Sequence, residues 1–173
     1  NVSHIVSMFP LNHPDLTLLE TDSQTDVFLY RNDGDRSPAY FITDLEVYAD
    51  WMHLKRDFLA RGFCPAKQLL IERDELFRPA LRIPEQSTGK DQMEIFIAKQ
   101  QGKEENETWT FAVPSPGFFV TSQTMFPGWR AKLDGQEVPI LKAYGIFRAV
   151  YVPAAGNHTI EFAYHPFGMR GIE

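Results

Sequence analysis

The sequence has few of the features from which function is usually inferred. Its 173 residues include one cysteine, Cys64, so no intramolecular disulfide can form. No apolar run reaches the length of about 20 residues that crosses a bilayer. The basic residues are scattered among acidic ones, and the net charge is −6. Because nucleic-acid surfaces need clustered positive charge, we expect no nucleic-acid partner.

Sequence signatures of catalysis are missing too. There is no G-x-S-x-G, H-E-x-x-H, Walker or paired C-x-x-C motif, and the histidines lack metal-ligand spacing. Asp33 and Asp35 resemble the start of a calcium loop, but Pro38 and Asp44 occupy its glycine and glutamate positions. Cys64 could be a nucleophile beside a histidine, although a structural thiol is the stronger interpretation. We therefore predict no catalytic residue, metal site or cofactor.

Aromatic residues are abundant, with 14 Phe, 6 Tyr and 3 Trp, and they favour strands and large buried side chains. Short apolar segments of period two alternate with Gly and Pro turns. The expected strands cover 27–31, 39–48, 68–72, 93–97, 109–113, 118–125, 147–152 and 159–164. Strands at this spacing predict a mostly β fold, either a β-sandwich or a jelly-roll-like arrangement.

One short helix is expected in the N-terminal half, over 51–61. Asp50 would be its N-cap and Gly62 would follow its last residue. Trp51, Leu54 and Phe58 recur at helical spacing and should form one apolar face of this helix.

The expected domain organisation follows from these segments. Residues 1–26 are interpreted as a linker or edge with a possible first strand, and 27–173 as a single β-rich domain. Within it, a smaller α+β half over 27–73 would be joined by 74–91 to a sandwich half over 92–166. Because the chain starts at Asn1 and shows no signal peptide, we expect it to be part of a longer protein.

A hairpin is expected over 129–141. Asp134 and Gly135 suit a two-residue type I′ turn, in which both residues have positive φ. The resulting pairs are Leu133 with Gln136, Ala131 with Val138 and Trp129 with Ile140. Since five of these six residues are apolar, the turn and the pattern agree on the register. Pro139 lacks an N–H group and predicts an edge strand.

The candidate binding residues are Tyr144, Trp129, Arg148 and Asp134. Tyr144 lies in a turn and is the best candidate for an exposed ring that stacks on a sugar. A core role is still the stronger interpretation of Tyr144. Trp129 would pair inward with Ile140, and Trp109 alternates with Phe111, so both tryptophans are expected to be buried.

The segment from Met125 to Pro166 contains an ordered series of short motifs. They are Phe126-Pro-Gly-Trp129, Asp134-Gly135, Val138-Pro139, Phe147-Arg148, Pro153-Ala-Ala-Gly-Asn-His158 and Glu161-Phe-Ala-Tyr-His-Pro166. As a series they resemble the C-terminal part of the YfhO-type bacterial membrane protein family. Upstream, Pro38-Ala-Tyr-Phe41 and Gly62-Phe-Cys-Pro65 are similar to two further segments of that family. They lack its arginine and carry Cys64 in place of its aspartate.

The resemblance implies a polytopic protein similar to lipid-linked-sugar glycosyltransferases. Its C-terminal region would be a soluble domain on the outer face of the bacterial cytoplasmic membrane. The catalytic carboxylates of such enzymes lie in the membrane part. The resemblance therefore implies a non-catalytic accessory domain that packs on the membrane-embedded part of the same parent chain or positions a glycan or lipid-linked sugar.

Two alternatives stay open, a carbohydrate-binding module and a structural domain for protein interaction. Exposed apolar patches would favour protein interaction, whereas a groove with polar groups beside an aromatic ring would favour sugar binding.

Overall fold

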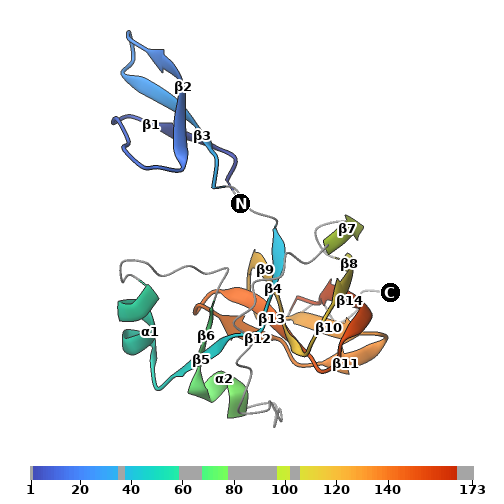
Figure 1. Cartoon of the computed structure of the whole chain (residues 1–173). Helices are drawn as coiled ribbons and strands as arrows, with labels where there is room; N and C mark the ends of the chain where they lie inside the picture. The colour runs from blue at the N-terminus through green and yellow to red at the C-terminus, as the bar shows by residue number, and fades with distance from the viewer. Residues whose placement is uncertain (1, 35–37, 59–67, 78–96, 102–105, 167–173) are drawn as a thin grey trace. The chain divides into compact units, whose positions relative to one another are not determined.

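The computed structural model describes residues 2–34, 38–58, 68–77, 97–101 and 106–166. These residues form a mostly β protein with two short helices (Figure 1), which confirms the predicted fold class. Only one of the helices was expected. The chain divides into an N-terminal unit, Asn1–Pro38, and a main unit, Ala39–Glu173.

The N-terminal unit is a three-stranded antiparallel sheet. Its strands are β1 (His4–Ser7), β3 (Val27–Asn32) and β2 (Leu16–Asp22), in that spatial order. Because β3 pairs with both other strands, the boundary expected after residue 26 falls inside this sheet. Residues 1–26 therefore contain two strands, where one possible strand was expected, and belong to the same sheet as β3. Tyr30 is the buried residue of this unit in the part of the chain described, and its hydroxyl oxygen accepts a hydrogen bond from Leu11 N at 2.8 Å.

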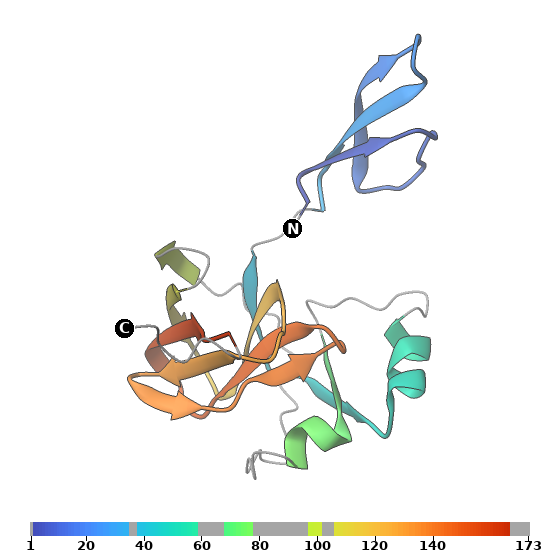
Figure 2. The same cartoon turned by 180° about the vertical axis from the view of Figure 1, so that it is seen from behind.

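The main unit contains two sheets and two helices (Figures 1 and 2). The six-stranded sheet runs β4 (Ala39–Ile42), β9 (Gly117–Thr124), β13 (Phe147–Val152), β12 (Leu141–Ala143), β6 (Leu69–Glu72) and β5 (Leu45–Tyr48). The five-stranded sheet runs β11 (Gln136–Val138), β10 (Trp129–Leu133), β14 (Gly156–Tyr164), β8 (Asn106–Val113) and β7 (Ile97–Gln101). The helices are α1 (Trp51–Phe58) and α2 (Arg73–Phe77). Neighbouring strands are antiparallel except β5 and β6, which are parallel.

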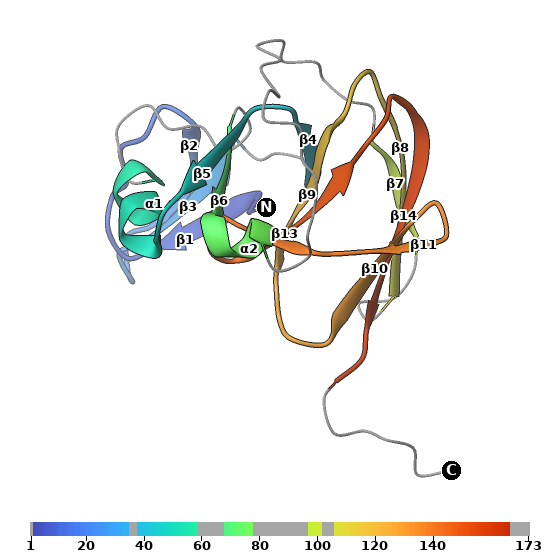
Figure 3. The ribbon, with the colours of Figure 1, turned by 90° about the horizontal axis from the view of Figure 1, so that it is seen from below.

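The six-stranded sheet curls into a half-barrel. Strands β4 and β5 follow each other in the chain, yet they occupy its opposite edges (Figure 3). The segment 39–48 is thus two strands, not one extended segment as expected. The expected α+β half over 27–73 is also corrected, because β4, β5 and β6 share one sheet with β9, β12 and β13.

Helix α1 begins as predicted. The side-chain Oδ1 of Asp50 accepts a hydrogen bond from His53 N at 3.1 Å, the geometry of an N-cap. Leu54 of the expected apolar face is fully buried. Trp51 of the same face is 44% exposed, because its ring lies against the turn at Gly145 and not in the core. The predicted end of the helix and Cys64 lie outside the described residues, as do 78–91 of the expected connection and Met93 and Ile95 of the expected strand.

Both faces of the six-stranded sheet are covered by apolar side chains. Phe119 and Val150 pack against the five-stranded sheet, while Phe118 and Ala149 belong to the half-barrel core that includes Leu54 of α1. This two-sided burial explains why β9 has five consecutive buried residues. The packing of the five-stranded sheet on one face is the predicted sandwich.

The predicted hairpin is present. The backbone φ is +51° at Asp134 and +81° at Gly135, as a type I′ turn requires. The pairs Leu133 with Gln136 and Ala131 with Val138 are confirmed. Strand β11 ends at Val138, so the third pair is not part of the ladder. As predicted, β11 is an edge strand.

Candidate functional site

Two of the four predicted binding residues meet between the two sheets. Arg148 on β13 is fully buried, because it shares the inward face of that strand with Val150 and Val152. The guanidinium carbon of Arg148 lies 4.0 Å from the ring centroid of Trp129 and 4.5 Å from that of Phe162. A buried guanidinium stacked on two rings is stabilised by cation–π attraction of roughly 2 kcal/mol or more per ring.

Glu107 on β8 supplies the opposite charge and is only 2% exposed. Arg148 Nη2 donates to Glu107 Oε1 at 3.1 Å and to Oε2 at 3.2 Å, and Trp109 Nε1 donates to Oε2 at 3.2 Å. Burial lowers the pKa of Arg148 below its ordinary value, and Glu107 acts in the opposite direction. We call Arg148, Glu107, Trp109, Trp129 and Phe162 the arginine cluster.

The hydrogen bonding of the arginine cluster is incomplete. Arg148 Nε and Nη1 have no hydrogen-bond partner among the described residues, and neither do Thr121 Oγ1 and Gln123 Oε1. Thr121 lies directly opposite Arg148 in the β9–β13 ladder. Glu107 and Arg148 bind each other below the protein surface. The arrangement can therefore fix the two sheets to each other, but it does not present either group to a substrate.

Sequence reasoning did not single out Glu107, although a signal was present. Glu107, Trp109, Phe111 and Val113 alternate along β8, and the last three are the apolar inward residues predicted for this strand. An acidic residue on an apolar face indicates a buried partner of opposite charge.

Asp134 lies at the other end of β10 from the arginine cluster and makes a separate set of contacts. Its Oδ1 accepts a hydrogen bond from Thr159 N at 2.8 Å, and its Oδ2 lies 2.7 Å from His158 Nδ1. His158 Nε2 in turn lies 3.0 Å from the carbonyl oxygen of Ala154. The bond from the Thr159 backbone, followed by that from His158, lowers the pKa of Asp134. This clasp ties the hairpin turn to β14.

Tyr144 is buried, with 3% of its surface exposed, which confirms the core role preferred from the sequence and leaves no exposed ring for a sugar. Its hydroxyl donates to the carbonyl oxygen of Gln68 at 2.9 Å, and its ring meets Phe147 edge-on at 6.4 Å. The backbone N–H of Tyr144 donates to Leu70 O at 2.8 Å. The turn is thus packed against β6, which a turn signal in the sequence cannot reveal.

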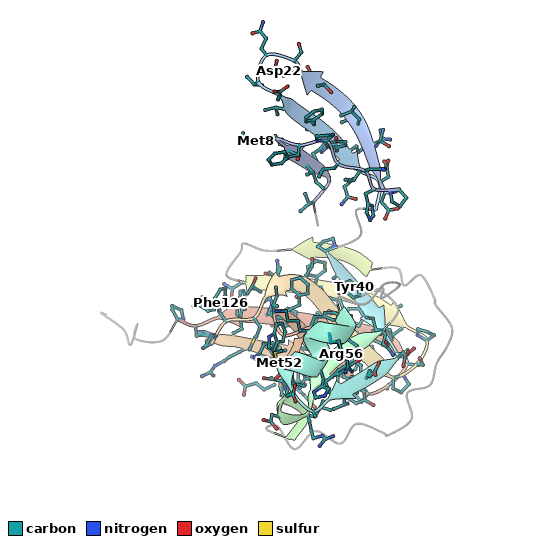
Figure 4. The ribbon with its side chains drawn as sticks, turned by 90° about the vertical axis from the view of Figure 1, so that its left-hand side faces the viewer. Met8, Asp22, Tyr40, Met52, Arg56 and Phe126 are labelled. Atoms are coloured by element: carbon teal, nitrogen blue, oxygen red, sulfur yellow. The ribbon has the colours of Figure 1, made fainter. Side chains whose placement is uncertain are left out.

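Four exposed apolar side chains form a surface of the main unit that we call the apolar patch. They are Trp51 (44% exposed), Met52 (69%), Phe126 (57%) and Ile146 (44%). A Cβ added at Gly145 would lie 2.2 Å from Trp51, so the start of α1 touches the turn before β13. Met125 N donates to Ile146 O at 2.7 Å, which joins the β9–β10 loop to the same turn. Figure 4 labels Met52 and Phe126 and faces the side where α1 lies.

In the part of the chain that the structure describes, no three His, Cys, Asp or Glu side chains are grouped so as to hold a metal ion. Within the same residues, no helix combines the length and apolar character needed to span a membrane. Comparison with protein-family models, curated proteins and solved structures finds no match to this chain.

Proposed function

We propose that this chain is a non-catalytic, extracytoplasmic accessory domain that packs through its apolar patch on the membrane-embedded part of the same parent protein. The observation that carries the proposal is the apolar patch. Three segments distant in sequence, α1, the β9–β10 loop and the β12–β13 turn, each contribute an exposed large side chain to it. Exposed large apolar side chains brought together from adjoining segments are typical of interaction sites.

The aromatic residues first considered for sugar stacking give less support. Tyr144 is buried. Trp129 is half-buried, with Arg148 over its ring at 4.0 Å and Tyr164 at 5.2 Å. A sugar needs an open ring face to stack on, and neither residue offers one. The burial of Tyr144 and the covered ring of Trp129 therefore favour a protein-interaction role over sugar binding at these two residues.

The Asp134–His158 pair also supports a non-catalytic role. A histidine that acts as general base must direct its second ring nitrogen at a nucleophile. Here that nitrogen is bonded to the backbone carbonyl of Ala154. The pair is therefore arranged to hold the hairpin turn on β14.

A photo-crosslinking experiment on the full-length parent in its native membrane tests the proposal. A photoreactive amino acid replaces Met52 or Phe126 in the apolar patch, and Glu137 on the edge strand β11 serves as the control because its side chain is 69% exposed. We expect cross-links to membrane segments of the same chain from both patch positions and none from Glu137.

Two results would overturn the proposal. One is cross-linking from the patch exclusively to a different protein, which would establish the protein-interaction alternative. The other is sugar transfer by the isolated chain, which would show that it is catalytic.

A further inference from the structure

A surface pocket of about 340 Å³ lies beside the β10–β11 hairpin, at the opposite end of β10 from the arginine cluster. It is formed by residues of that hairpin together with Tyr151 and Pro153 at the end of β13. This volume is near the lower limit of roughly 300–1,000 Å³ for small-molecule sites, so it suits a ligand of one ring.

Three polar groups line the pocket. Tyr151 has no hydrogen-bond partner for its hydroxyl among the described residues, and the same holds for the side-chain amide of Gln136. Asp134 is 48% exposed and uses one lone pair of each carboxylate oxygen in the clasp, which leaves acceptor capacity. Burial raises the pKa of Tyr151, so its phenol keeps its proton and can donate.

The remaining walls are apolar, because Leu133, Val138 and two prolines also line the pocket. The ring of Tyr151 packs against the buried ring of Phe118 in a tilted arrangement, with centroids 5.2 Å apart. Apolar walls beside a phenol, an amide and a carboxylate match a ligand that has both C–H faces and hydroxyl groups.

Other ligand classes fit this lining less well. No lysine, arginine or histidine is among the lining residues, and Asp134 repels phosphate and carboxylate groups. A single carboxylate is too small a donor set for a calcium or magnesium ion, which takes six or more oxygen ligands. A purely apolar ligand would leave three polar groups without water or partner.

From these contacts we infer that the pocket binds a neutral, hydroxyl-rich ring, a single pyranose unit of a glycan, with Tyr151 as stacking residue and Asp134 and Gln136 as hydroxyl partners. This goes beyond the packing role proposed above and uses a different surface. Ile146 of the apolar patch precedes β13, whereas Tyr151 is near its end, and five residues of strand span roughly 16 Å.

Titration of the ¹⁵N-labelled chain with neutral methyl pyranosides, followed by amide chemical shifts, tests the inference. We expect shifts confined to residues 133–139 and 151–153. The expected Kd is about 1 mM, because a single ring has few atoms and can make few contacts in total. Gln136→Ala, on an exposed edge strand, should weaken binding about threefold to tenfold without affecting the fold. Tyr151→Ala should abolish it, and Trp51→Ala in the apolar patch should leave Kd unchanged.

Three results would overturn the inference. They are no shifts at about ten times the expected Kd, shifts centred on the apolar patch, and full affinity in both the Gln136→Ala and Tyr151→Ala variants. Because Tyr151 contacts Phe118, the fold of its variant is checked by its amide spectrum, and Gln136→Ala decides the outcome if that spectrum is lost. Cross-linking of the apolar patch in the parent protein does not depend on this pocket, so either proposal can fail alone.

Discussion

Replacing Glu107 with Gln removes one charge from the buried pair and changes almost no volume. Glu107 Oε2 accepts hydrogen bonds from both Trp109 and Arg148, so the amide oxygen of the new side chain will take that position. The amide nitrogen then faces Arg148 Nη2, which is also a donor. The guanidinium stays fully buried without its counter-charge, and one of its hydrogen bonds is lost.

The expected loss of stability is large. Removing one partner of a buried ion pair costs about 3–5 kcal/mol, because the remaining charge is neither solvated nor paired. With a urea m-value of about 2 kcal/mol per M, the unfolding midpoint should fall by about 2 M. Tryptophan fluorescence follows the transition well, since all three tryptophans lie in the main unit and two belong to the arginine cluster.

A second substitution separates the charge effect from packing. Arg148→Met keeps an apolar chain on the rings of Trp129 and Phe162 and removes the buried cation. If the lone charge causes the loss, Glu107→Gln with Arg148→Met should be more stable than Glu107→Gln alone, with a coupling energy of at least about 1 kcal/mol in the double-mutant cycle. A midpoint shift below about 0.5 M for Glu107→Gln, or additive effects in the cycle, would refute the reasoning.

Two further predictions concern the turns. Asp134→Asn keeps the turn conformation but cannot ionise. Because the folded-state pKa of Asp134 lies below the ordinary 3.8, the ionised clasp stabilises the wild type fully above that pH and loses its effect as the pH falls through the folded value. The difference in melting temperature between the two proteins should therefore shrink on acidification, and a difference that is constant with pH would contradict this. Gly145→Ala should destabilise the chain in urea titrations by more than Gly135→Ala. Both sites have positive φ, with a backbone cost of about 1–2 kcal/mol, but only at Gly145 does the new Cβ strike Trp51. Equal losses would contradict the contact.

The sequence predicted those parts of the structure that depend on only a few neighbouring residues, namely one hairpin turn and the start of one helix. Asp134-Gly135 and the apolar residues around it specify the turn and most of its register, because both act within a few residues. Asp50 likewise predicts the start of α1. The clasp between Asp134 and His158 could not be predicted in this way, since it depends on how β14 pairs with β10.

The arginine cluster and the half-barrel could not be predicted from local sequence signals. Arg148 and Glu107 each alternate with buried apolar residues along their own strand. Only the packing of the two sheets shows that the two side chains meet. Thr43 and Asp44 give no sign that the chain crosses there from one sheet edge to the other. Tyr144 lies in a turn and was for that reason the best candidate for an exposed ring, but a strand some 70 positions earlier covers it.

The position of β4 at the sheet edge also affects how the chain folds as it is synthesised. Residue Ala39 pairs with Thr121, so β4 emerges 82 positions before its partner. At roughly 5–20 residues per second, this strand waits about 4–16 s without a neighbour. The strands of the N-terminal unit pair entirely among residues 4–32 and need no such delay. The first 38 residues can therefore acquire their sheet while the main unit is still incomplete, whereas β4 stays without its partner until β9 has been synthesised.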